Sequence, residues 1–281
     1  MPKNPDIRTL LSLLDDEDEG PALEAMAELL WRGEEVFPYL AELQESPDPL
    51  LRRRVHQLES ALTMRRRRSE FSRLLSMPHP DVPRILVELH LQWYDNDPLP
   101  EMASRLAAFL ASGRAEHPRT LADLSAYFRK CGIVAERETT LRPEDYCIGV
   151  MLLDRIGSAA VWTLVARLLL PDPDAVQIVR NVEEFALYDG EHLLLPERDW
   201  RIVRAPARAE LELWDDRKVL KFAASMLFSA AVNSDSFRYV LTIGQALSGL
   251  PDDEVLDYMP YPYRPAPEEE AHEEDAPAER N

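Results

Sequence analysis

The fold class is decided at residues 182–196, VEEFALYDGEHLLLP, which predict a β-hairpin. Two short runs rich in aromatic and leucine residues flank Asp189 and Gly190. Asp-Gly is a strong hairpin signal because glycine tolerates a positive φ. The nearby runs AVQIVR (175–180) and WRIV (200–203) continue the strand pattern. We therefore predict a small antiparallel sheet around this hairpin.

Helical patterns surround the predicted sheet. SAAVWTLVARLLL (158–170) is apolar almost all round, which is typical of a helix at the centre of a domain. We expect Trp162 and Val165 to be buried between the sheet and the preceding helices. After the sheet, KVLKFAASMLFSAAV (218–232) and FRYVLTIGQALSGL (237–250) predict an antiparallel helix pair. The fold class predicted from these patterns is α+β and mostly helical.

The N-terminal region predicts several short amphipathic helices. Apolar residues recur at helical spacing from Ile7 to Leu62, and such helices must stack to bury their apolar faces. At the other end the chain becomes rich in proline, glutamate and alanine, so a compact body ending near Tyr258 is expected. The predicted organisation is a HEAT-like segment (1–68), a core containing the hairpin (69–205), a helix pair (206–259) and a disordered acidic tail (260–281).

Composition bounds the possible functions. The formal net charge of −19 disfavours nucleic acid and anionic membranes as bulk partners. No apolar run approaches 18 residues, and the N-terminal stretch lacks the apolar core of a secretory leader, so a soluble cytoplasmic protein is expected. Two cysteines, Cys131 and Cys147, do not make a disulfide scaffold. The six histidines show no metal-binding spacing, so neither a metal nor a cofactor is predicted.

The order of these segments resembles bacterial transglutaminase-like proteins of the Sir-B type. The resemblance runs over roughly residues 5–255. It rests on the HEAT-like opening, the approach RPEDYCIGVMLLDRIGS (142–158) to the central helix, the hairpin EEFALYDGEHLLLP (183–196) and the tetratricopeptide-like closing helix pair. It implies a transglutaminase-like core, in which a Cys begins the central helix while a His and an Asp lie on the following strands.

Carried over residue by residue, the resemblance implies a degenerate triad. The nucleophile position falls at about Ala159, Glu184 stands where the family has its His, and Leu195 stands where the family has its Asp. Alanine cannot attack a carbonyl, and leucine cannot orient a base by hydrogen bonding. Ser158, beside Ala159, is interpreted as the N-cap of the central helix. We expect the three positions to lie together in space without a Cys-His pair beside them.

One concentrated positive region stands out. Arg65, Arg66, Arg67 and Arg68 follow one another on a predicted helix, so they wind around several of its faces. The first interpretation is a solvated helix end. The alternatives are contacts to acidic side chains of this chain, an interaction surface or, third, nucleic acid.

Two functional hypotheses follow. The favoured one is a noncatalytic protein-interaction or scaffold module, a pseudoenzyme with an unnamed protein partner and an undetermined oligomeric state. The rival is a thiol-dependent hydrolase or transferase with a relocated site, using Cys147 or Cys131 with His192. A relocated site requires the sulfur and the base within about 3–4 Å of each other.

Overall fold

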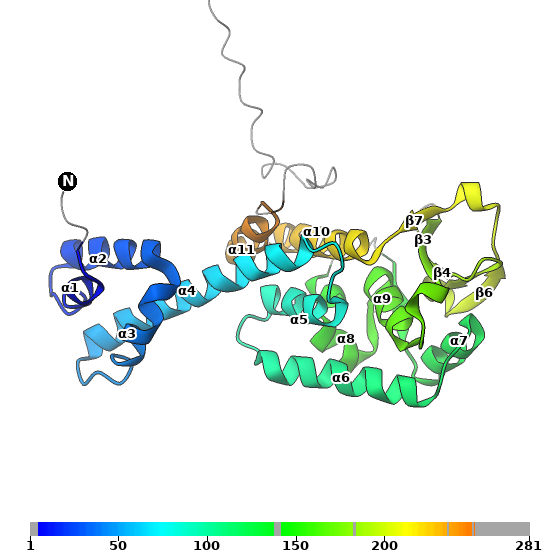
Figure 1. The fold of residues 1–281 in the computed structure, drawn as a ribbon, viewed down its shortest axis with the longest axis horizontal. Helices are drawn as coiled ribbons and strands as arrows, with labels where there is room; N and C mark the ends of the chain where they lie inside the picture. The colour runs from blue at the N-terminus through cyan, green and yellow to red at the C-terminus, as the bar shows by residue number, and fades with distance from the viewer. Residues whose placement is uncertain (1–4, 138–141, 182–183, 235, 249, 251–281) are drawn as a thin grey trace, which may run out of the picture.

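The protein is mostly helical and carries one five-stranded antiparallel sheet, so the predicted α+β class is confirmed. The computed structural model describes residues 5–137, 142–181, 184–234, 236–248 and 250. Figure 1 shows an elongated molecule. The N-terminal helices lie at one end, a long helix joins them to the main body, and the sheet lies at the opposite end.

The N-terminal helices form a small unit with a core of its own. They are α1 (Ile7–Leu11), α2 (Glu19–Arg32), α3 (Phe37–Ala41) and the long α4 (Pro49–Leu75), with a 3₁₀ turn at Gly33–Val36. Helix α4 begins after Asp48, whose carboxylate accepts a hydrogen bond from the Leu50 N–H at 2.8 Å. Leucines from all four helices pack together in this core, among them Leu11, Leu29, Leu40 and Leu58.

The main body packs seven helices and a sheet around a second, larger core. The helices are α5 (Val82–Trp93), α6 (Leu99–Ala115), α7 (Leu121–Lys130), α8 (Ile148–Asp154), α9 (Ala159–Leu169), α10 (Asp216–Asn233) and α11 (Phe237–Ser248). Helix α9 is the predicted central helix. Trp162 and Val165 are fully buried there, and the Trp162 ring lies 6.0 Å from the rings of Phe109 and Phe128. Their predicted burial is confirmed.

The sheet has the strand order β6-β5-β4-β3-β7. Its strands are β3 (Gln177–Asn181), β4 (Glu184–Tyr188), β5 (His192–Leu195), β6 (Arg201–Arg204) and β7 (Glu212–Trp214). The predicted hairpin is β4 and β5. Gly190 in its turn has φ +105°, and the Asp189 carboxylate accepts the N–H groups of Glu191 and His192. A separate parallel pair, β1 (Val134–Glu136) and β2 (Ile156–Ser158), was not predicted.

The two faces of the sheet pack against different layers. One face meets α9 and α10 in the main core, and its residues are Ile178, Phe185, Leu187 and Leu194. The other face forms a small third cluster, whose members are Val179, Ala186, Tyr188, Leu193, Leu195 and Leu211. Strands β6 and β7 lie at opposite edges but follow each other in sequence, so their connection returns across this second face. It includes a 3₁₀ turn at Arg208–Glu210, just before Leu211.

Two predicted boundaries fall inside continuous structure. Position 68/69 lies within α4, which contributes Leu62 to the N-terminal core and Phe71 to the main core. Position 205/206 separates β7 from the sheet in which it pairs with β3. The predicted helix pair is α10 and α11, and it shares the main core with α9. The acidic tail, 260–281, and the predicted end of the body near Tyr258 lie outside the described residues.

Candidate functional site

The N-terminus of α9 is the position where the family resemblance places a nucleophile. Ala159 is fully buried and begins the helix, and the Ser158 hydroxyl accepts the Val161 N–H at 3.4 Å, as the N-cap interpretation predicts. The parallel strands β1 and β2 hold this point through the pairing of Gly157 with Ala135. A Cβ on Gly157 would lie only 2.5 Å from Met151. The start of α9 is therefore closely packed against α8.

The structure places one of the three predicted triad positions, Leu195, on the face of the sheet that points away from Ala159. Ala159 belongs to the main core, whereas Leu195 is buried in the cluster on the other face of the sheet. The physical reason is the two-residue alternation of a strand, which turns Leu194 toward α9 and Leu195 away from it. Glu184 instead pairs with Arg198 at 2.8 Å. The expectation that Leu195 faces Ala159 is therefore corrected, whereas the proximity of Glu184 to Ala159 stays a prediction.

The two cysteines of the rival hypothesis lie in different surroundings. Cys147 precedes α8 and is fully buried, and burial, with Glu144 and Asp145 nearby, raises the pKa of its thiol well above the usual value. Cys131 is half-buried at the end of α7. Within the described residues, no hydrogen bond joins either sulfur to His192, which lies half-buried at the hairpin turn beside Asp189.

The four consecutive arginines of α4, residues 65–68, contact four different neighbours. Arg65 donates to the Leu30 carbonyl at 2.8 Å, and Arg67 donates to the Asp95 carbonyl at 2.6 Å. The Arg66 guanidinium lies 5.3 Å from the centre of the Phe37 ring, and Arg68 donates to the Gln245 side chain. This dispersal follows from the helical rotation of about 100° per residue. The run therefore links α4 to α2, α3, the α5–α6 turn and α11, instead of presenting one basic patch.

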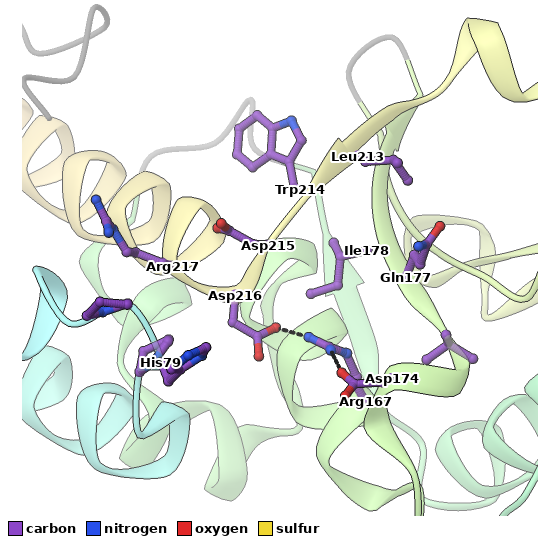
Figure 2. Close-up of a pocket in the computed structure, with 13 residues that line it drawn as sticks. His79, Arg167, Asp174, Gln177, Ile178, Leu213, Trp214, Asp215, Asp216 and Arg217 are labelled. Atoms are coloured by element: carbon purple, nitrogen blue, oxygen red, sulfur yellow. Dashed lines mark hydrogen bonds and ion pairs between the residues drawn. The ribbon is translucent and has the colours of Figure 1, made fainter. Parts of the chain in front are cut away.

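A pocket of about 640 Å³ lies at the opposite end of α9 from Ala159. Figure 2 shows its lining. One wall comes from β3 and β7, with Ile178, Leu213 and Trp214, and another comes from the start of α10. The turn between α4 and α5 contributes His79.

Arg167 is the central charge of this pocket. Its guanidinium pairs with Asp174 at 2.9 Å and with Asp216, and its Nε–H donates to the Pro173 carbonyl at 2.8 Å (Figure 2). Burial raises the pKa of Asp216, and the neighbouring Arg167 opposes that shift. Both carboxylates bind the same guanidinium. Arg167 therefore links three elements, which are α9, the turn before β3, and α10.

The lining of this pocket is mainly charged and apolar. Its 13 residues include carboxylates, arginines and His79, but none is Cys, Ser, Thr or Lys. No group of three or more His, Cys, Asp or Glu within the described residues has a geometry that could hold a metal ion. Nor does any described helix combine the length and apolar character needed to cross a bilayer.

Sequence reasoning missed the residues of this pocket. The only local signals were the PDPD break after the central helix and the paired Asp215 and Asp216 before the apolar run of α10. Asp215 is the N-cap, since its carboxylate accepts the Lys218 N–H at 2.7 Å. Nothing in the local sequence indicates that Arg167, 49 residues earlier, meets Asp216.

Comparison with known proteins identified no relative. No protein-family model, no curated protein and no solved structure matches this chain.

Proposed function

We propose that this chain is a noncatalytic, transglutaminase-like pseudoenzyme of the bacterial cytoplasm that acts by binding another protein. One observation carries the noncatalytic part of the proposal. Ala159, fully buried, begins the central helix, where a helix N-terminus would activate a cysteine in a working enzyme. An alanine there offers no nucleophile.

The surroundings of the remaining candidate groups support the same proposal. The Glu184 carboxylate forms an ion pair with Arg198, and the Leu195 side chain faces away from α9. The raised pKa of the Cys147 thiol keeps it in the neutral, unreactive form at pH 7. The rival thiol enzyme would need a thiolate with a base beside it, and no feature of the described residues favours that arrangement over the pseudoenzyme.

An exposed apolar stripe on α2 supports the protein-binding part of the proposal. Leu23 and Trp31 are 61% and 70% exposed, and Ala27 is exposed between them, so the three share one face at spacings of four residues. A partly exposed tryptophan is a typical anchor of protein interfaces. The exposed Glu24 lies beside the stripe, whereas Glu28 already pairs with Arg32 at 3.2 Å, so we propose a partner helix that combines apolar side chains with a lysine or arginine for Glu24.

Site-specific photo-crosslinking in the native host tests this assignment. A photoreactive residue replaces Leu23 in one variant and Leu153, a 67% exposed leucine on α8, in the matched control. We expect one recurring, basic-helix-containing protein crosslinked from position 23 and not from position 153, and loss of that product when Trp31→Ala is added. Equal products from both positions, or no product from position 23, would contradict the proposal.

A further inference from the structure

An apolar groove of about 550 Å³ runs between α5 and α6, and it shares no lining residue with the pocket of Figure 2. Helix α6 contributes Ala103, Ala107 and Ala111, which are exposed and share one face at four-residue spacing. Helix α5 contributes Pro83 and Val87. The buried Leu106 and Leu110 also line the groove. A volume of this size is within the range that holds small organic ligands, about 300–1,000 Å³.

A buried carboxylate lines this groove without a partner. Glu88 is only 4% exposed, and within the described residues its carboxylate makes no hydrogen bond and no ion pair. Two arginines act on the Glu88 carboxylate through their charge, and one of them, Arg84, also lines the groove, but both guanidinium groups have other partners. Arg84 pairs with Glu70 at 2.7 Å, and Arg67 donates to the Asp95 carbonyl at 2.6 Å. Burial raises the pKa of Glu88, while Arg84 and Arg67 oppose this shift and Glu70 adds to it.

The Glu88 carboxylate oxygens are not fully enclosed, so they open onto the groove, and no other acidic side chain of the lining lies at similar depth. Arg114, at the far end, donates to the Leu168 carbonyl at 2.9 Å, so it is not directed at an incoming anion. A ligand that fills the groove and brings one positive charge would supply the partner that Glu88 lacks. We propose that this groove binds an amphiphilic organic cation, with its apolar body between α5 and α6 and its protonated amine against Glu88.

Three probes with one apolar body and different charges test this site. Titration calorimetry with 4-phenylbutylamine, 4-phenylbutanol and 4-phenylbutyrate at pH 8 compares a cation, a neutral molecule and an anion. We expect the amine to bind at least tenfold more tightly than the alcohol, and the anion most weakly. The affinity of the amine should fall as pH is lowered from 8 toward 4, because Glu88 takes up a proton, while that of the alcohol should not change.

Two pairs of variants locate the site. Glu88→Gln should reduce the affinity for the amine at least tenfold, to that of the alcohol, whereas Glu101→Gln, at an exposed position of α6, should not. Ala107→Trp should abolish binding of the amine and of the alcohol by filling the groove, whereas Ala108→Trp, next to it and outside the lining set, should preserve both. Unchanged thermal unfolding of each variant establishes that it is folded.

Several outcomes would overturn this inference. They are equal affinity for the three probes, tightest binding of the anion, an amine affinity that Glu88→Gln leaves unchanged, and no binding of any probe at millimolar concentration. The crosslinking result at α2 is independent of all of them, because the groove and the stripe share no residue.

Discussion

Trp162→Ala is the sharpest test of the main core. The indole is fully buried in α9 and contacts Phe109 and Phe128 with ring centres 6.0 Å apart. A tryptophan of this kind buries roughly 150–250 Å², which at about 25 cal/mol per Å² amounts to about 4–6 kcal/mol. Alanine retains part of that contact and leaves a cavity, so we expect the free energy of unfolding to fall by about 3–5 kcal/mol.

Urea unfolding followed by circular dichroism measures this loss, and two further variants define its cause. Trp162→Phe keeps an aromatic ring and removes an indole N–H that has no hydrogen-bond partner among the described residues. It should therefore cost less than about 1.5 kcal/mol, because the lost ring volume is offset by the removed polar group. Trp31→Ala, at a position 70% exposed, should change stability by less than about 0.5 kcal/mol. A loss below about 1 kcal/mol for Trp162→Ala would place α9 outside the core and refute the reasoning.

Three further predictions follow from single residues. Thr120→Ala removes the N-cap of α7, whose hydroxyl accepts the Asp123 N–H, and should lower the free energy of unfolding by about 0.5–2 kcal/mol in denaturant titration; no change would mean that the cap is dispensable. Gly190→Ala places a side chain at φ +105° and should cost about 1–3 kcal/mol by the same measurement, whereas a neutral result would mean that the turn can relax. Glu88→Gln should raise thermal stability at pH 8, and its advantage should shrink as pH falls toward 4, since a carboxyl whose folded-state pKa is raised destabilises the folded protein when ionised; an advantage that grows at low pH would contradict this sign.

The hairpin and the central helix could be predicted from sequence because their signals are local. Asp189-Gly190 specifies the turn, and the all-round apolar character of 158–170 requires burial. The strands β1, β2 and β7 each have three residues, too few for a two-residue periodicity to stand out. Their pairing depends on contacts between distant segments, so it was missed.

Which residues lie on each face of the sheet could not be predicted from the sequence. A correct hairpin still leaves open which alternate residues face the core, and one step of register exchanges Leu194 for Leu195. The partners of the buried charged residues could not be predicted from the sequence either. The ion pair between Arg167 and Asp216 and the unpaired Glu88 both depend on which helices become neighbours.

The central claim is that no catalytic thiol operates in this protein. Labelling with a thiol-directed, activity-based electrophile tests it most directly. Mass spectrometry of the native and the urea-unfolded chain at pH 7 gives a labelling rate for each of the two cysteines, with Cys147→Ser and Cys131→Ser as controls. We predict that Cys147 reacts at least about tenfold more slowly in the folded protein than in the unfolded one, because burial holds its thiol neutral and covered. Rapid labelling of either cysteine in the folded state, lost in His192→Ala, would contradict the pseudoenzyme assignment and establish a working thiol site.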